Sequence, residues 1–391
     1  MGRSAEVADI FRAYGRVYRE NHKLPIRHLR AMRAIEICRT AELGGHKYKC
    51  DECGRFEISY NSCRNRHCPK CLNLEKERWV DARKKDVLPT HYFHEVFTIP
   101  EGLRALALRN QRIVYGILFR AVAETLNKLA RDPKHIGAEI GVIAVLHTWS
   151  QTLIDHPHIH CIVTGGGLSL DGERWISCRK KFFMPVKVLS AVFKGKFLDY
   201  LKQAYESGEL SFNGEIEALK DKKNFKKLLD KLYWQKWHVY CKPPFKATEN
   251  VVEYLGRYTH RVAISNERIL KVTDDHVTIR YRDYASGNKM KEMALNANEF
   301  IRRFLLHVLP DKFVKIRHYG ILSNRNLKTK LLKCKELLRV PVLEPDEKPL
   351  SWQELFKKIT GIDPTLCPHC KKGRLFLFEV LAPISGRSPP R

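Results

Sequence analysis

Cysteines crowded into one short segment constrain this chain more than any other feature of its sequence. Two Cys-x-x-Cys pairs, Cys50/Cys53 and Cys68/Cys71, are separated by 14 residues. Two such pairs at that spacing are typical of a tetrahedral zinc site made of four thiolates. A segment this short has little apolar core of its own, so a bound metal would have to stabilise it. We therefore predict a structural zinc site built from these four cysteines.

Two further candidate ligands lie in the loop between the pairs. Cys63 and His67 fall inside it, so a second zinc ion or a mixed Cys-Cys-His-Cys ligand set stays open. The loop also contains the basic run RNRHCPK, which is suited to phosphate contact. A purely structural role for the zinc and direct contact with DNA are therefore both consistent with this segment.

A third Cys-x-x-Cys pair near the end of the chain forms half of a metal site. It consists of Cys367 and Cys370. The other ligands would have to be His369, Cys334 or residues of another chain; otherwise this pair forms no metal site. Twelve cysteines in a chain without a recognisable secretory signal favour metal binding over disulfides.

The charge balance indicates a polyanionic partner. The chain has 71 Lys and Arg residues against 43 Asp and Glu, a net charge of +28. A surface of this sign is the usual footprint of nucleic-acid binding, although an inert basic surface is the alternative. Because no apolar run reaches the roughly 20 residues of a membrane helix, we expect a cytoplasmic, nucleoid-associated protein with no membrane contact.

A pair of histidines marks a second candidate metal site. Residues 141–151 and 158–167 both have the composition of strands, and the short turn between them predicts an antiparallel hairpin. Side chains alternate along a strand, so His158 and His160 would share a face while Ile159 points to the other. Two imidazoles on one face can bind one divalent ion.

The third ligand of this ion would come from the neighbouring strand or the turn. The period of two places His147, Trp149 and Gln151 on one face, with Gln151 nearest the turn. We predict Gln151 as the third ligand. Asp155 and His147 are the alternatives.

Two tyrosines supply candidate nucleophiles. Residues 247–261 have a helical pattern, in which Tyr254 and Tyr258 lie one turn apart on one face. A tyrosine can attack phosphorus and become joined to DNA, while a histidine-bound ion polarises the phosphodiester. No nucleotide-binding GxxxxGK[ST] motif occurs, which fits a reaction that conserves bond energy in the protein–DNA link. Nearby basic residues are candidates for DNA contact: Arg257, His260 and Arg261.

The remaining pattern predicts an α+β fold. Helices are expected within 6–43, 74–85, 101–130, 187–235 and 296–309, strands within 90–100 and 237–245, and a β-hairpin at 268–284. The final segment, PISGRSPPR, has the composition of a disordered tail.

Several of these blocks, in this order, resemble a known family. The blocks are CDECGRFEISYNSCRNRHCPKC, HYFHEVFTIP, LHTWSQTLIDHPHIHCIVTGGGL, YLGRYTHRVAISN, VTIRYRDY, EFIRRFLLHVLP, FVKIRHYGILSNR and CPHC. They resemble the two-tyrosine transposases of rolling-circle insertion sequences, the IS91 family, over about residues 10 to 375. This family belongs to the HUH endonucleases, named for a His-hydrophobic-His motif that matches His158, Ile159 and His160.

The resemblance implies a mechanism and its parts. It implies an antiparallel sheet flanked by helices, Mg²⁺ or Mn²⁺ as the catalytic ion, and single-stranded DNA as the substrate. Tyr254 and Tyr258 match the two nucleophiles, which would form a 5′-phosphotyrosine intermediate, and residues 46–74 match the N-terminal zinc-binding domain. No helicase motif occurs, so unwinding would come from a host protein.

We accordingly divide the chain into three parts. Residues 1–85 would form a helical and zinc-binding domain, 86–310 the catalytic domain, and 311–391 a small basic C-terminal region. The leading interpretation is a transposase that nicks and joins single-stranded DNA. The alternatives are a plasmid replication initiator or relaxase with the same chemistry, and a zinc-dependent DNA-binding regulator without catalysis. The oligomeric state is left open.

Overall fold

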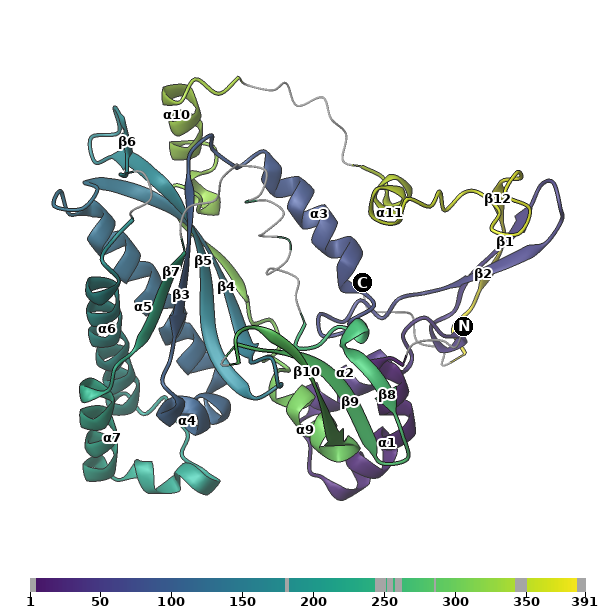
Figure 1. Ribbon diagram of the computed structural model, residues 1–391, viewed down its shortest axis with the longest axis horizontal. Helices are drawn as coiled ribbons and strands as arrows, with labels where there is room; N and C mark the ends of the chain where they lie inside the picture. The colour runs from purple at the N-terminus through teal and green to yellow at the C-terminus, as the bar shows by residue number, and fades with distance from the viewer. Residues whose placement is uncertain are drawn as a thin grey trace.

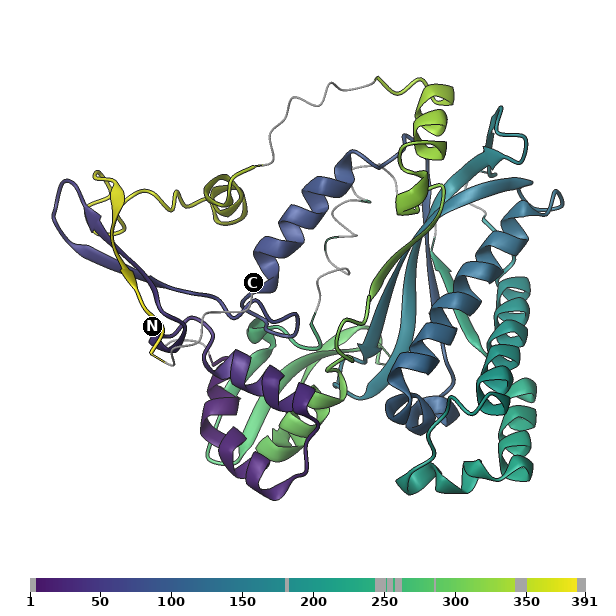
Figure 2. The same ribbon diagram turned by 180° about the vertical axis from the view of Figure 1, so that it is seen from behind.

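The chain folds as an α+β protein with antiparallel sheets, as the sequence predicts. The computed structural model describes residues 5–179, 183–242, 251, 256, 262–284, 286–341 and 350–384, apart from the side chains of 72–75. Figure 1 shows the fold, and Figure 2 shows it from behind. Three sheets have the strand orders β11-β4-β5-β3-β7, with β6 beside β5, then β10-β9-β8, and β12-β1-β2. No helix within these ranges is long and apolar enough to cross a membrane.

The central sheet has six strands and contains the predicted hairpin. Its strands are β3 (Tyr92–Thr98), β4 (Ala138–Trp149), β5 (Asp155–Ser169), β6 (Trp175–Ser177), β7 (His238–Lys242) and β11 (Ile316–Gly320). β4 and β5 pair antiparallel along most of their length, and both are longer than predicted. A glycine is required at position 165 of β5, because a β-carbon there would lie 2.6 Å from the backbone oxygen of His91.

Helices cover one face of this sheet, as both views show. They are α4 (Arg104–Arg109), α5 (Gln111–Arg131), α6 (Val186–Glu206) and α7 (Lys222–Trp234). Phe97 and Ile159 on the sheet pack with the apolar sides of α5 and α6 in the largest core cluster. The predicted helix at 101–130 is interrupted at Asn110, because its side-chain amide donates to the carbonyl oxygens of Leu106 and Ser211 at 3.1 and 3.0 Å.

The opposite face of the sheet is divided between a small core and a polar region. At one end α10 (Lys330–Leu337) packs on Ile143 and Ile162 in a separate apolar cluster. Helix α3 (Leu72–Lys84) also lies on this side of the molecule (Figure 1). The histidines of β4 and β5 occupy the other end of this face.

A second sheet completes a core with the N-terminal helices. Helices α1 (Val7–Asn21) and α2 (Ile26–Glu36) pack against α9 (Ala297–Leu306) and against β8 (Ile269–Val272), β9 (His276–Asp283) and β10 (Lys289–Asn296). Phe11 on α1 meets Phe304 on α9 edge-to-face, with ring centroids 5.2 Å apart. The predicted hairpin at 268–284 is thus two strands of a sheet whose third strand, β10, sequence reasoning missed.

A third sheet joins segments from the two ends of the chain. It contains β1 (Gly45–Cys50), β2 (Phe56–Tyr60) and β12 (Leu375–Leu381), with β1 in the middle. Helix α11 (Trp352–Thr360) precedes β12. Short 3₁₀ helices occur at Ala41–Leu43, Glu101–Leu103, Gly214–Lys220, Asn266–Arg268 and Asn324–Asn326. Packing therefore crosses both predicted domain boundaries, and the three-part division stays a prediction.

Candidate functional site

Three histidines converge on the polar end of the central sheet. His147 of β4 lies directly opposite His158 of β5, and His160 follows two residues later on the same face. One ring nitrogen from each of the three lies within 4.8 Å of the others. His147 is buried, whereas His158 and His160 are half-exposed. The ring of His147 also stacks on that of Trp149, with centroids 4.6 Å apart and planes 20° from parallel.

Hydrogen bonds fix the direction in which the two β5 histidines present their rings. The Nδ1 of His158 donates to the carbonyl oxygen of His156 at 2.6 Å, so its Nε2 carries a lone pair. The Nδ1 of His160 lies 2.8 Å from the Nε2 of His94 on β3. Burial lowers the pKa of His94 to about 3, so this imidazole is neutral at physiological pH. His94 therefore offers His160 a neutral hydrogen-bond partner behind the site.

The arrangement fits a divalent cation. The Nε2 atoms of His158 and His160 are 3.0 Å apart, close to the separation of two nitrogens about 2.1 Å from one ion at a right angle. The distance is also that of an N–H···N hydrogen bond between the two rings, so a proton joins them when no cation is bound and a cation would replace that proton. Three neutral imidazoles suit ions such as Mn²⁺ better than Mg²⁺, which takes oxygen ligands.

The third member of the group is His147, one of the two alternatives to Gln151. The side-chain amide of Gln151 donates instead to the Tyr284 hydroxyl at 3.3 Å. Asp155 is buried, and its position in β5 places its side chain on the helix-covered face with Ile159. Burial raises the pKa of Asp155 to about 7. Asp155 is therefore separated by the sheet from the histidines.

The predicted nucleophiles fall outside the described residues. These are Tyr254 and Tyr258, together with the predicted DNA contacts Arg257, His260 and Arg261. Gly256, between the two tyrosines, is described and is buried against α3. A β-carbon on Gly256 would lie 2.7 Å from the Cγ2 of Val80. A different tyrosine, Tyr240 on β7, is exposed on the histidine face, since it pairs with Val96, which pairs with His160.

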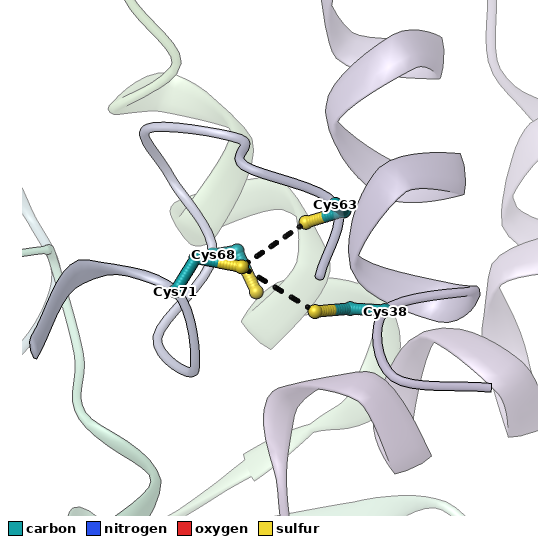
Figure 3. Close-up of side chains that lie close together, drawn as sticks. All are labelled: Cys38, Cys63, Cys68 and Cys71. Atoms are coloured by element: carbon teal, nitrogen blue, oxygen red, sulfur yellow. Dashed lines mark hydrogen bonds between the residues drawn. The ribbon is translucent and has the colours of Figure 1, made fainter. Parts of the chain in front are cut away.

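The first cysteine cluster lies beside the N-terminal helices. It comprises Cys38, Cys63, Cys68 and Cys71, shown in Figure 3. The sulfur of Cys71 is 3.4 Å from that of Cys38 and 3.6 Å from that of Cys63. Hydrogen bonds with neighbouring thiols, first of all Cys38, lower the pKa of the Cys71 thiol and raise the pKa of the Cys63 and Cys68 thiols, because thiols this close do not all ionise without a metal.

The second cysteine cluster joins the two ends of the chain. Cys50 and Cys53, at the tip of the β1–β2 hairpin, meet Cys367 and Cys370. The sulfurs of Cys50 and Cys370 are 3.7 Å apart, as are those of Cys53 and Cys367. Gly373 leaves room for this contact, because a β-carbon there would lie 2.5 Å from the Cys50 sulfur.

Both clusters match the dimensions of a four-thiolate zinc site. Sulfurs bound about 2.3 Å from one tetrahedral zinc ion are about 3.8 Å apart. The sulfur–sulfur distances of 3.4 to 3.7 Å agree with this geometry. Among the described residues, each cluster consists of four thiols, a ligand set that favours zinc over harder cations.

The predicted grouping of the cysteines is wrong. Cys50 and Cys53 do not share a site with Cys68 and Cys71, because each pair is completed by cysteines from another part of the chain. Cys63 is a member of the first cluster, and the sequence had left it open as an additional zinc ligand. His67 belongs to neither cluster; it is half-buried, and desolvation lowers its pKa well below the usual range.

One ligand was missed altogether. Cys38 follows the helix α2 and belongs to no Cys-x-x-Cys pair. The only signal for it was its position shortly before the cysteine-rich segment. The C-terminal pair Cys367 and Cys370 supplies two ligands of a four-cysteine site, and Cys50 and Cys53 supply the other two.

Two family models match these two regions. Residues 10–99 match a model described as "Transposase zinc-binding domain", and residues 141–330 match one described as "Putative transposase". The first span holds the whole of the Cys38 cluster and half of the second cluster. The second span holds the three histidines.

Two curated relatives resemble the chain over most of its length. "Putative transposase y4qJ" of Sinorhizobium fredii is 48% identical over 395 residues, which cover 100% of this chain and 99% of the relative. "Transposase for insertion sequence element IS801" of Pseudomonas savastanoi pv. phaseolicola is 28% identical over 337 residues, covering 85% of this chain and 79% of the relative.

The fold, the cysteine clusters and these matches define a DNA-cleaving and strand-transferring enzyme, a transposase with a zinc-binding domain. The chain belongs to the IS91 family of rolling-circle transposases. This confirms the predicted family. It also favours the transposase over the replication initiator and the non-catalytic regulator.

Proposed function

We propose that the histidine face nicks and joins single-stranded DNA, with Tyr254 and Tyr258 as the nucleophiles. The observation that carries this proposal is the convergence of His147, His158 and His160 within 4.8 Å on one sheet face. The roles of the tyrosines rest on their spacing in the sequence and on the family. Arg257, which lies between the two tyrosines in the sequence, and His260 and Arg261, which follow them, contact the DNA backbone.

The reaction is a phosphoryl transfer to tyrosine and back. The phenol oxygen of one tyrosine attacks a phosphodiester phosphorus and releases its proton, and the bond between phosphorus and the 3′ oxygen breaks. The products are a 5′-phosphotyrosine and a free 3′ hydroxyl. A 3′ hydroxyl then attacks the phosphotyrosine, which re-forms a phosphodiester and returns the phenol. No nucleotide is consumed, since the link to tyrosine conserves the bond energy.

Residues of this chain orient the reacting groups. His147, His158 and His160 would hold a divalent cation, Mn²⁺ or Mg²⁺, which polarises the phosphodiester and stabilises charge on its oxygens. His94 holds His160 so that its Nε2 faces the other two rings. Trp149 supports the ring of His147. The sheet thus fixes three ligands on two adjacent strands before DNA binds.

The two cysteine clusters have a structural role in this proposal. Each holds one zinc ion, the first anchoring the segment after α2 and the second joining the β1–β2 hairpin to the C-terminal segment. DNA strands are separated by a host helicase, and the protein acts at the nucleoid. The net charge of +28 supplies non-specific affinity for either strand.

A covalent adduct tests the proposal. Purified protein is incubated with single-stranded DNA and Mn²⁺ and analysed on a denaturing gel, and the DNA-linked peptide is mapped by mass spectrometry. We expect a 5′-linked adduct on Tyr254 or Tyr258, reduced in each single Phe variant and lost in the double variant. The control is Tyr240→Phe, because Tyr240 is exposed on the same face. An adduct on Tyr240, or an undiminished adduct in the double variant, would disprove the assignment.

A further inference from the structure

The third sheet exposes a face that neither the cysteine clusters nor the histidine site uses. We call it the ribbon face and define it by Lys47, Lys49, Phe56, Ile58, Tyr60 and Phe378. Lys49 pairs with Phe56 across β1 and β2, and Lys47 pairs with Ile58, so these side chains share one face. In Figure 1 this sheet lies at the edge of the molecule, away from the central sheet.

The ribbon face is apolar and aromatic at its centre. Phe56 is 45% exposed, Ile58 is 44% exposed and Phe378 is 52% exposed. The rings of Phe56 and Phe378 meet edge-to-face with centroids 5.0 Å apart. Large aromatic side chains that stay exposed together on one small sheet indicate a binding surface.

Two ammonium groups lie over these rings. The Nζ of Lys47 is 4.7 Å from the centre of the Phe56 ring and 5.5 Å from that of Phe378. The Nζ of Lys49 is 5.8 and 6.0 Å from the same two centres. Lys47 also forms an ion pair with Glu379 of β12, with its Nζ 3.4 Å from a carboxylate oxygen, so its flexible stem must leave this carboxylate as well as the rings to reach a phosphate.

Exposed aromatic rings together with lysines favour some classes of binding partner for the ribbon face over others. Single-stranded nucleic acid offers both unpaired bases, which stack on aromatic rings, and phosphates, which attract lysine. A duplex keeps its base faces covered. A second copy of the chain, packed face to face about a twofold axis, would bring Lys47 and Lys49 towards the same lysines of its partner. Charge complementarity therefore favours DNA over self-association.

We propose that the ribbon face is a second single-strand binding site, at which bases stack on Phe56 and Phe378 and phosphates contact Lys47 and Lys49. The inference deepens the proposed function, because it rests on single-stranded DNA being the substrate. In this proposal the third sheet, which the second cysteine cluster stabilises, binds a DNA strand at a distance from the histidine face.

Binding measurements on the full-length protein test the proposal. Fluorescence anisotropy is recorded with a dT oligomer and with an abasic oligomer of equal length, in buffer without added Mg²⁺ or Mn²⁺ so that cleavage does not occur. We expect the Phe56→Ala/Phe378→Ala variant to bind the dT oligomer about tenfold more weakly and the abasic oligomer within about twofold of the unaltered protein. Lys47→Gln/Lys49→Gln should weaken both and reduce the salt dependence.

Control variants distinguish a loss of base stacking from a loss of the folded structure. Phe56→Leu/Phe378→Leu keeps apolar volume without the rings and should behave like the alanine pair. Trp234→Ala removes an aromatic ring that is 83% exposed on α7 and should leave both affinities unchanged. Zinc content is measured on each variant, and it should equal that of the unaltered protein.

Three outcomes decide the matter. Equal dT affinity in the alanine pair and the unaltered protein would overturn the ribbon-face site while leaving the nuclease proposal intact. The same result, together with loss of a dimer in sedimentation, would assign the face to a second copy of the chain. A stacking preference that depends on the two rings, in a protein that forms no tyrosine adduct, would support the ribbon face and contradict the nuclease proposal.

Discussion

His147 and His158 face each other across the β4–β5 strand pair, so that two strands and not one contribute imidazoles to the candidate catalytic site. Their ring centroids are 5.5 Å apart and their planes are nearly perpendicular, at 85°. A ligand on each strand couples the position of the ion to the register of the hairpin. A slip of one residue would turn the histidines of one strand to the helix-covered face.

The ligand set predicts how substitutions affect metal binding. His147→Ala should weaken Mn²⁺ binding by about 100-fold or more, because it removes one of the three proposed ligands. Gln151→Ala should leave Mn²⁺ affinity within about twofold, since its amide contacts Tyr284. Isothermal titration of Mn²⁺ into the zinc-loaded protein measures both. The reverse order of effects would restore Gln151 as the third ligand.

His94 should act as a positioning residue for His160. When the Nε2 of His160 binds an ion, its Nδ1–H must donate, and the acceptor is the Nε2 of His94. His94→Phe removes that acceptor and should weaken Mn²⁺ binding by about 10- to 100-fold. His94→Gln, which keeps an acceptor, should lose less. NMR of the imidazole nitrogens should show that His160 changes tautomer in the phenylalanine variant, an effect that a general loss of stability would not produce.

The two cysteine clusters predict two zinc ions per chain. Elemental analysis of the native protein should find about two zinc ions, and Cys370→Ser or Cys38→Ser should each remove about one. Cys178→Ser is the matched control, because Cys178 belongs to neither cluster and should not change the zinc content. A single zinc ion in the unaltered protein would show that one cluster is only a group of thiols.

Gly256 predicts a steric link between α3 and the tyrosine segment. Gly256→Ala places a methyl group 2.7 Å from Val80, so one of the two segments must move, at a cost of about 1–3 kcal/mol in stability. We expect less covalent adduct from this variant and recovery in Gly256→Ala/Val80→Ala, which provides the space. Gly116→Ala on α5 is the control, since no atom lies within 4 Å of the added carbon. Equal loss of adduct in the single and double variants would exclude steric repulsion.

The buried Glu95 predicts a pH-dependent stability. It lies between Cys161 and Cys241 on the helix-covered face, and burial raises its pKa to about 7, above its ordinary 4.5. The folded state therefore holds a proton that the unfolded state has lost, and stability falls as the pH rises from about 4.5 to 7. Above this range the ionised carboxylate lowers the free energy of unfolding by about 3 kcal/mol.

Thermal unfolding of Glu95→Gln tests this account. The variant should gain stability relative to the unaltered protein at pH 8, and this gain should shrink towards pH 5. Glu336→Gln, whose parent side chain is 70% exposed, is the control and should show no such trend. A difference that stays constant between pH 5 and pH 8 would contradict the raised pKa.

Local patterns in the sequence predicted the elements that depend on neighbouring residues. The β4–β5 hairpin follows from alternation and a short turn, and the shared face of His158 and His160 follows from the same rule. The third ligand could not be obtained in this way. The strand pairing is irregular between His147 and Trp149, so strict alternation does not extend to Gln151 in the turn.

The cysteine clusters show the corresponding limit for distant segments. All Cys-x-x-Cys pairs present similar half-sites, and nothing in their spacing states which halves combine. The pairing of Cys50 with Cys370 depends on β12 joining β1, an association between segments more than 300 residues apart. Cys38 was hidden for a similar reason, since its partners meet it only when the chain turns back after α2.

The second cysteine cluster also affects the order in which the protein matures on the ribosome. Cys50 and Cys53 are synthesised more than 300 residues before their partners, Cys367 and Cys370. This metal site can therefore close only on a chain that has been translated beyond Cys370. A product of premature termination would keep the first cluster and leave the tip of the β1–β2 hairpin unclosed. Completion of the site would thus distinguish chains that contain Cys367 and Cys370 from chains that terminate before them.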